Sequence, residues 1–398
     1  MKNSFAGKRP ATKLTQIGKD RHFDGGQSVN PPVVRASTVL FETVEQQAAF
    51  RARRDDEQVF TYGSYGTPTT FALENAVAEL EGGYRTRLFP TGLSAAAMVF
   101  LAYLEPGDHV LIVDSVYEPV RSFSQQFLKP YGIEFDYFSP DIPDIGELFR
   151  PRTKLVYTEC PGSLVFEMCD LPAIASVARS RGARVAVDNT WGSGLLYRPL
   201  TLGADISVMA ATKYLGGHSD VMMGTVTTNE SAWRQLQDRC NAFGVAVSPD
   251  DAWLVLRGMR TLAARMTIHE RNAHALMEWL GMQPEVVHVH SPAMPGHPGH
   301  DLWLRDCHGT NGLLSFELEP EVSREDAQRL ANALKLFGVG SSWGGYESLV
   351  SLPNLVKART MSDWGRRGPV VRLHAGLEDE ADLIADLEVA FEALRSRR

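Results

Sequence analysis

The sequence predicts an α/β protein built on a mostly parallel central sheet, followed by a smaller α/β unit. Short apolar runs rich in β-branched residues are typical of buried strands. Such runs occupy residues 109–115, 154–160, 184–190, 205–211 and 224–229. Helical patterns such as LPAIASVARSRG separate several of them. Because parallel strands need crossover connections, which are usually helices, this alternation favours parallel pairing.

The pattern changes from about residue 250, where long helical stretches begin and alternating strands and helices follow. The chain ends in the amphipathic segment DEADLIADLEVAFEALRSR. We therefore expect three parts: an N-terminal arm at 1–65, a central domain at 66–255 and a C-terminal domain at 256–398. The arm contains VNPPVV and little regular periodicity, which suits a segment lying on another subunit better than an independent core.

Composition limits the classes of partner. The 398 residues are 44% hydrophobic and carry a formal net charge of -8, so a basic surface for nucleic acid is not expected. The N-terminal residues have no apolar core of the kind a signal peptide needs, and no apolar run is long enough to span a membrane. The four cysteines show no CxxC spacing. We expect reduced thiols, no nucleic-acid or membrane partner and a cytoplasmic location.

A candidate anion site lies in the segment FPTGLSAAAMVFLAYLEPGD, where an extended run turns into an alanine-rich helix at Thr91-Gly92. The free backbone N–H groups of Gly92 and Leu93 and the positive end of the helix dipole would attract a phosphate. A plain strand-to-helix turn explains the same glycine, so this segment alone leaves both interpretations open.

Two charged residues follow later strand predictions. Asp188 closes the run RVAVD, and Lys213 follows SVMAAT and precedes the pair Gly216-Gly217. A surface lysine and a helix-cap aspartate are the ordinary alternatives. However, chemistry gathers beyond the carboxyl ends of parallel strands, and a carboxylate there needs a cationic partner.

The anion site, the carboxylate and the lysine together match the needs of one cofactor, pyridoxal 5'-phosphate (PLP). PLP has a phosphate tail, a pyridine nitrogen that must stay protonated and an aldehyde that captures an amine. Lys213 would supply that amine and Asp188 would face the pyridine nitrogen. Burial lowers the pKa of a lysine, which provides the neutral amine that this chemistry uses.

The motifs YGTPT, VYEP, VDNTW, ATKYLGGHSD, SWGGYESL and RLHAGLED span nearly the whole chain. Together they resemble the Cys/Met metabolism family of PLP-dependent enzymes, the trans-sulfuration enzymes. The resemblance implies an aspartate-aminotransferase-like fold (fold type I) and a homotetramer, a dimer of dimers with active sites between subunits. It further implies a carbon–sulfur β-lyase that converts L-cystathionine, an amino-acid thioether, to homocysteine, pyruvate and ammonia in methionine biosynthesis. The γ-lyases, γ-synthases and broader cysteine-S-conjugate β-lyases or cysteine desulfhydrases of the family remain alternatives.

The resemblance also assigns cofactor-binding residues. Tyr117 of VYEP would stack on the pyridine ring, and Tyr62 would reach the phosphate in the neighbouring subunit; both join Lys213 as catalytic residues. Gly92 and Leu93 match phosphate-binding backbone positions. The hydroxyl of Thr212 matches a phosphate ligand as well.

The same resemblance predicts substrate-binding residues and shows two positions where this chain departs from the family pattern. Arg372 would clamp the substrate α-carboxylate, beside Ser342 and Trp343. The family usually has arginine where this chain has Ser64, and often serine where it has Ala211. Both changes predict a weaker phosphate site. Trp343 is typical of the β-lyases, whereas enzymes acting at Cγ commonly carry a smaller aliphatic residue there.

Two distant alternatives concern other classes of protein. A metallohydrolase would use the histidines of VVHVHSPAMPGHPGH, which are His288, His290, His297 and His300. These residues are expected in a proline- and glycine-rich loop without a nearby carboxylate until Asp301, so no metal site is predicted. A non-catalytic binding protein descended from such an enzyme is the other alternative, but it would be expected to have lost Lys213 or Asp188.

Overall fold

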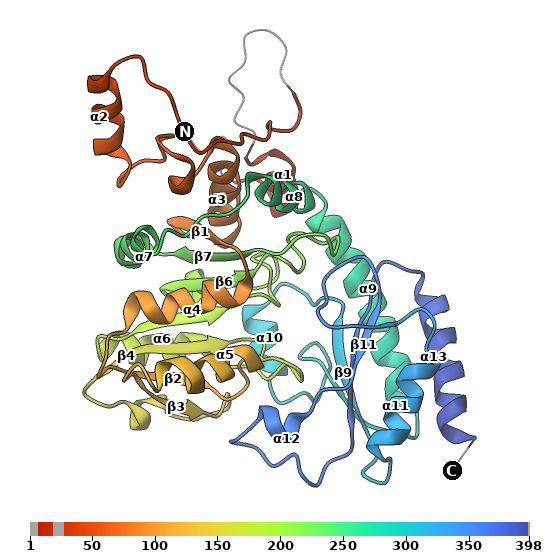
Figure 1. The fold of residues 1–398 in the computed structure, drawn as a ribbon. Helices are drawn as coiled ribbons and strands as arrows, with labels where there is room; N and C mark the ends of the chain where they lie inside the picture. The colour runs from red at the N-terminus through yellow and green to blue at the C-terminus, as the bar shows by residue number, and fades with distance from the viewer. Residues whose placement is uncertain (1–6, 19–27, 397–398) are drawn as a thin grey trace.

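A computed structural model describes residues 7–18 and 28–396. Its centre is a seven-stranded sheet with the order β1-β7-β6-β5-β4-β2-β3 (Figure 1). The strands are β1 (Arg85–Phe89), β2 (His109–Val113), β3 (Glu134–Phe138), β4 (Thr153–Glu159), β5 (Arg184–Asp188), β6 (Ile206–Ala210) and β7 (Gly224–Thr228). Strands β6, β5, β4, β2 and β3 are parallel, and β7 is antiparallel to both β1 and β6. The carboxyl ends of β2, β4, β5 and β6 therefore meet at one edge.

Helices cover this sheet, as the alternating sequence pattern predicts. They are α3 (Pro68–Glu81), α4 (Gly92–Tyr103), α5 (Glu118–Phe123), α6 (Leu171–Ser180) and α7 (Glu230–Ala242). Figure 1 shows α4 and α5 along one face of the sheet. The alanine-rich α4 packs against β6 and β7, and its small side chains allow a close approach. Every residue of β2 is buried, as expected for a strand covered on both faces.

A second sheet of five strands has the order β10-β11-β12-β9-β8. Its strands are β8 (Val286–His290), β9 (Leu313–Leu318), β10 (Gly338–Val339), β11 (Leu349–Ser351) and β12 (Val370–His374). The helices of this half are α8 (Pro249–Met259), α9 (Leu262–Gly281), α10 (His300–Asp306), α11 (Arg324–Ala333), α12 (Leu355–Ala358) and α13 (Glu380–Arg395). An apolar core that includes Leu276, Phe316 and Phe391 joins α9, β9 and α13.

The N-terminal segment contains more regular structure than expected. Helix α1 (Pro10–Gln16) buries Leu14 against the body, and α2 (Val44–Arg53) has no buried residue. Figure 1 shows α2 standing apart from the two sheets. The expected arm at 1–65 also includes residues 1–6 and 19–27, which lie outside the described residues. The boundaries at 65 and 255 stay predictions, although each sheet falls within one of the predicted domains.

The five predicted central strands are confirmed to within a residue or two, and the sheet contains two more, β1 and β3. The helical stretch after residue 250 is two helices, α8 and α9, with Arg260 and Thr261 between them.

The expectation that all four histidines of 286–300 sit in a loop is wrong. His288 and His290 lie on β8, and His290 Nε2 is 3.5 Å from Glu317 Oε2 on β9. A carboxylate is therefore nearer than the sequence suggested. Even so, the described part of the chain holds no group of three or more His, Cys, Asp or Glu residues placed to bind a metal. Within the same residues, every helix is too short or too polar to cross a lipid bilayer.

Candidate active site

Lys213 lies three residues after β6, at the edge where the parallel strands end. Its backbone is held by hydrogen bonds from Lys213 N to Ala210 O (3.0 Å) and from Gly217 N to Lys213 O (2.8 Å). The ammonium Nζ donates a hydrogen bond to Ser342 Oγ and lies 5.3 Å from the ring centre of Trp343. The lysine therefore points toward the C-terminal half rather than into open solvent.

The environment of Lys213 favours its neutral form. Burial lowers its pKa from an ordinary 10.5 to about 8, and the positive charge of Arg372 adds to this effect. The negative charge of Asp188 acts in the opposite direction but is the smallest of the three influences. An amine with a pKa of about 8 is partly neutral near neutral pH, as a nucleophile or general base requires.

Asp188 ends β5, next to β6. Its Oδ1 accepts hydrogen bonds from Thr190 N (3.0 Å) and Thr190 Oγ1 (2.6 Å), and that hydroxyl in turn accepts one from Ala210 N (2.9 Å). Burial raises the pKa of Asp188, although the bonds from Thr190 and the charge of Lys213 oppose this. No donor among the described residues reaches Oδ2, so one carboxylate oxygen of this partly buried residue is available for a cationic partner.

The N-terminus of α4 lies where the sequence predicts an anion site. Thr91 and Ser94 form a reciprocal capping box, in which each hydroxyl accepts a hydrogen bond from the other residue's backbone N–H. The N–H groups of Gly92 and Leu93 have no acceptor within the described chain. A Cβ on Gly92 would lie 2.6 Å from the Cβ of Ala210, so only glycine lets this turn approach the end of β6.

The Thr212 hydroxyl, which the sequence predicts to bind the phosphate, already has hydrogen-bond partners in the chain. Its Oγ1 accepts a hydrogen bond from Met223 N (2.9 Å) and donates one to Met223 O (3.2 Å). The hydroxyl proton would have to turn away from Met223 to bind a phosphate. Ala211 is fully buried and carries no hydroxyl, as the sequence implied. The role of Thr212 in phosphate binding stays a prediction.

Tyr117 directly precedes helix α5, beyond the end of β2. Its backbone N–H donates a 2.6 Å hydrogen bond to Glu159 Oε2, while its side chain is partly exposed at the edge of the site. Burial raises the pKa of the Tyr117 phenol, the negative charges of Glu159 and Asp188 add to this, and Arg372 opposes it. The ring therefore lies among the charged groups of the site.

Glu159 ends β4 and is the register neighbour of Asp188 on β5. Burial raises its pKa well above the ordinary value, and the nearby charge of Asp188 raises it further. Two carboxyl groups at adjacent strand ends disfavour each other's ionisation. Each carboxylate has one oxygen without a donor among the described residues, because Tyr117 N bonds to Glu159 Oε2 and Thr190 bonds to Asp188 Oδ1.

Arg372 lies on β12, and no acceptor for its guanidinium is present in the part of the chain that the structure describes. Burial lowers its pKa, and Tyr117 opposes this effect. A partly buried guanidinium without a counter-ion is unfavourable, and its planar fork matches the geometry of a carboxylate. The position therefore favours binding of a carboxylate ligand beside Lys213.

The segment 342–347 brings Ser342 and Trp343 to the lysine. Gly344 has φ +90°, and a Cβ there would lie 2.9 Å from Tyr214 N and 3.1 Å from Lys213 Cα. Gly344 N donates a hydrogen bond to His374 Nε2 (3.1 Å), whose Nδ1 lies 3.1 Å from Glu347 O. Since Nε2 accepts, His374 is neutral with its proton on Nδ1, and burial keeps its pKa well below the ordinary value. His374 thus fixes the segment against the turn that carries Lys213.

Tyr62 and Ser64 are not brought to this group of residues. Tyr62 pairs with Thr38 in an isolated bridge and is about half exposed, and Ser64 lies in the short 3-10 helix η1 (Gly63–Tyr65). No contact joins either residue to the Lys213 site within the described ranges 7–18 and 28–396. Their expected action on a neighbouring subunit stays a prediction.

Three residues that hold the site residues in place were not predicted from the sequence. Thr190 could have been suspected, because a hydroxyl two residues after a strand-end aspartate commonly bonds back to it. Glu159 also had a signal, since it ends a predicted strand as Asp188 does. His374 had none, because its partners lie 27 and 30 residues away in the chain.

These residues satisfy the chemical demands of PLP. The open N–H groups of α4 fit a phosphate, the free oxygen of Asp188 fits a protonated ring nitrogen, and Lys213 offers an amine of lowered pKa. Arg372 lies close enough to lower the pKa of Lys213, and its guanidinium would suit a carboxylate. Fold and site together define the class of the protein: a PLP-dependent enzyme of fold type I.

The comparisons agree with this class. The model of the Cys/Met metabolism PLP-dependent enzyme family matches residues 11–392. A putative cystathionine beta-lyase of Rhizobium johnstonii is 47% identical over 386 residues, 96% of each chain. Cystathionine beta-lyase of Bordetella avium is also 47% identical, over 92% of this chain and 93% of its own.

A solved structure supports the fold. The crystal structure of metB from Corynebacterium glutamicum superposes with a TM-score of 0.88 at 30% identity, covering 98% of this chain and 99% of the other. The chain therefore belongs to the Cys/Met metabolism family of PLP-dependent enzymes. The aspartate-aminotransferase-like fold and the PLP cofactor predicted from the sequence are confirmed.

Proposed function

We propose that this enzyme is a cystathionine β-lyase, which cleaves the Cβ–S bond of L-cystathionine in methionine biosynthesis. One water is consumed, and homocysteine, pyruvate and ammonia are released. The observation that carries the proposal is that Arg372, near Lys213, has no acceptor for its guanidinium among the described residues, which fits an α-amino acid at the lysine. The names of the relatives at 47% identity support the same substrate.

PLP, when bound, captures the substrate amine and accepts the negative charge that develops at Cα. Arg372 would hold the α-carboxylate through two parallel hydrogen bonds, which fixes the amino acid relative to Lys213. Lys213 would take the proton from Cα, a role suited to an amine with a pKa of about 8. Asp188 would hold the proton on the pyridine nitrogen, and Tyr117 would cover the ring. Gly92, Leu93 and Thr212 would bind the phosphate.

We assign to Trp343 the preference for breaking the Cβ–S bond rather than the Cγ–S bond. The centre of its indole is 5.3 Å from Lys213 Nζ and 5.4 Å from the centre of the Tyr214 ring. A bulky, held side chain beside the carboxylate clamp restricts how the substrate chain lies over the cofactor. Such orientation effects are worth several kcal/mol of barrier. Cleavage at Cγ, giving cysteine and 2-oxobutyrate, is the alternative function.

The proposal extends to assembly and location. Leu40 and Val44 of the arm are 90% and 76% exposed, which favours a second copy of the chain as their cover. In a dimer of dimers, Tyr62 and Ser64 would reach the neighbouring subunit's phosphate site. The four cysteines are free thiols, which suits a reducing cytoplasm.

Identification of the keto acid formed from L-cystathionine tests the function. The PLP-loaded enzyme is incubated with the substrate, and the quenched products are separated by chromatography. Pyruvate and homocysteine are expected as the main products, with no turnover by a Lys213→Ala control. Dominant 2-oxobutyrate would make the protein a γ-lyase, and no keto acid from any β-thio amino acid would refute the lyase proposal.

A further inference from the structure

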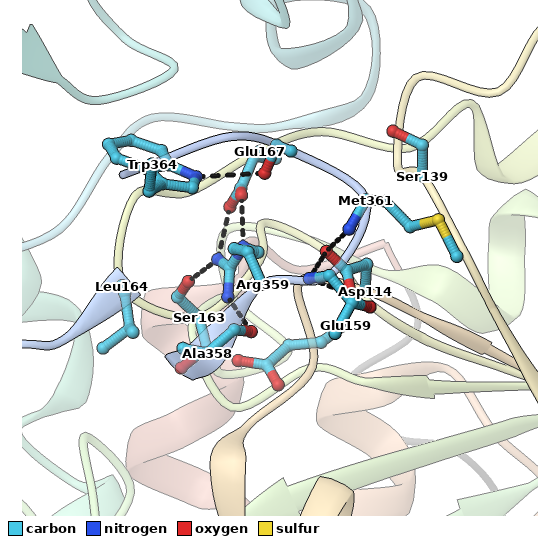
Figure 2. Close-up of polar contacts among 12 residues, drawn as sticks. Asp114, Ser139, Glu159, Ser163, Leu164, Glu167, Ala358, Arg359, Met361 and Trp364 are labelled. Carbon is cyan, nitrogen blue, oxygen red and sulfur yellow. Dashed lines mark hydrogen bonds and ion pairs between the residues drawn. The ribbon is translucent and has the colours of Figure 1, made fainter. Parts of the chain in front are cut away.

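The connection between β11 and β12 leaves the C-terminal sheet and contacts the central one. We call residues 355–364 the strap; it comprises α12 and the loop that follows. Figure 2 shows its residues Arg359 and Met361 next to Asp114, Ser163 and Glu167 of the central half. The strap therefore joins the strand that carries Arg372 to the edge where the parallel strands end.

Asp114 is the first anchor of the strap. This carboxylate directly follows β2 and is 1% exposed. It accepts hydrogen bonds from Thr360 N (2.9 Å), Thr360 Oγ1 (2.6 Å) and Met361 N (3.0 Å), and one from Arg121 of α5 (2.7 Å). Burial alone would raise its pKa, but these bonds hold it below the ordinary value. An ionised, fully bonded Asp114 thus ties the strap to the start of the 114–117 turn.

Arg359 is the second anchor. Its side chain is 1% exposed and pairs with both oxygens of Glu167 (2.7 and 2.9 Å). It also donates a hydrogen bond to Ser163 O, while Ser163 N donates to Ser115 O at 2.8 Å. Ser115 belongs to the same turn as Asp114, so the strap holds that turn directly at Asp114 and, through Ser163, at Ser115.

The turn held in this way ends at Tyr117. The Tyr117 N–H is held separately, by a 2.6 Å hydrogen bond to Glu159 Oε2. We propose that Asp114 and Thr360 are positioning residues. Their hydrogen bonds hold the strap against the 114–117 turn and thereby fix the position of the Tyr117 ring over the cofactor. The proposal rests on the proposed placement of PLP beside Tyr117. Neither residue contacts Lys213, so neither takes part in the chemistry.

The test removes the Thr360 hydroxyl, which bonds to Asp114. Thr360→Val is nearly isosteric and loses only the bond to Asp114 Oδ1, whereas Thr360→Ser keeps it. PLP is titrated into each cofactor-free protein. We expect Thr360→Val to raise the Kd for PLP about three- to tenfold, the range expected for impaired aromatic stacking. Thr360→Ser and the exposed strap variant Val356→Ala should stay within about twofold of the unsubstituted protein.

A double-mutant cycle shows whether Thr360 acts through Tyr117. In a Tyr117→Leu background, where the ring is absent, Thr360→Val should have almost no further effect on the Kd. Faster amide exchange in the 114–123 segment of cofactor-free Thr360→Val, with β5 unchanged, is the accompanying signature. An unaltered Kd in Thr360→Val, or the same rise in both backgrounds, overturns the positioning role. Failure of the unsubstituted protein to bind PLP overturns the proposed function itself, and this inference with it.

Discussion

Lys213 should reduce the stability of the cofactor-free protein, and replacing it with methionine should stabilise the fold. The lysine has a pKa of about 8 in the folded protein, against 10.5 for an unperturbed lysine. Below pH 8 the lysine is positively charged in both the folded and the unfolded chain. In the folded chain this charge is partly removed from water, which destabilises the fold. The difference between the two pKa values corresponds to about 3 kcal/mol at neutral pH. Methionine has a similar length and needs no hydration.

The gain should be smaller than that upper value, because methionine also loses the bond to Ser342 and the contact with the Trp343 ring. We expect Lys213→Met to raise the free energy of unfolding by about 2 kcal/mol at pH 7. The direction in which stability changes with pH follows from which state of the chain, folded or unfolded, binds more protons. Between pH 8 and 10.5 the unfolded chain binds more protons, so the lysine protein gains stability with rising pH and the advantage of methionine shrinks.

Urea unfolding of the two cofactor-free proteins, at equal subunit concentration and at pH 7 and pH 10, measures both effects. Lys129→Met, at an exposed position after α5, serves as the matched control and should change little at either pH. A Lys213→Met protein that is no more stable than the parent at pH 7 would refute the reasoning. An advantage that stays the same at pH 10 would show that packing, not charge burial, is its cause.

Three further substitutions test other parts of the site. Ser64→Arg should lower the Kd for PLP about tenfold or more, by a charge-assisted contact to the neighbouring subunit's phosphate; unchanged affinity in a PLP titration would count against that placement. Asp188→Asn should still bind PLP but lower kcat at least about a hundredfold, because the ring nitrogen loses its anionic partner; near-normal kcat in steady-state assays would contradict this. His374→Ala should lower the free energy of unfolding in urea by about 2 to 4 kcal/mol, since Gly344 N and Glu347 O lose their partner; an unchanged unfolding midpoint would contradict the role of His374 in holding the 342–347 segment.

The elements that carry the cofactor could be predicted because their signals are local. Asp188 and Lys213 each follow an apolar run, and the meeting of parallel strand ends at one edge is a general rule. The turn at Gly92 is equally local, since a strand, a capping threonine and an alanine-rich helix follow one another in the chain. The open N–H groups and the close approach of Gly92 to Ala210 agree with that expectation.

Long-range contacts could not be predicted from the residues alone. Ser342 meets Lys213 across 129 positions of the chain, and Thr360 meets Asp114 across 246. Neither contact has a periodicity or spacing that would reveal it. His288 and His290 were misplaced because the prolines and glycines after them favoured a loop, whereas β8 pairs with β9 at the edge of the second sheet. The roles of Tyr62 and Ser64 depend on a second chain, and one sequence does not define that geometry.

The opposed influences of Arg372 and Asp188 on Lys213 lead to a last prediction, on how substrate binding tunes the base. Arg372 lowers the pKa of Lys213, and Asp188 raises it. A carboxylate bound to Arg372 neutralises the first influence and leaves the second. The pKa of Lys213 should therefore rise when a carboxylate binds, so the lysine becomes a stronger base as its substrate arrives.

Propionate, which has the carboxylate but no amine, separates this effect from the reaction. After reductive ¹³C-methylation of the cofactor-free protein, NMR follows the Lys213 signal against pH with and without propionate. A higher pKa with propionate is expected, and Arg372→Gln should start from a higher pKa and not respond. A downward shift would contradict the electrostatic argument, and so would an equal response in Arg372→Gln, because the carboxylate would then act from another place. The observed geometry favours the upward shift, since Arg372 has no counter-ion of its own among the described residues and a bound carboxylate would supply it.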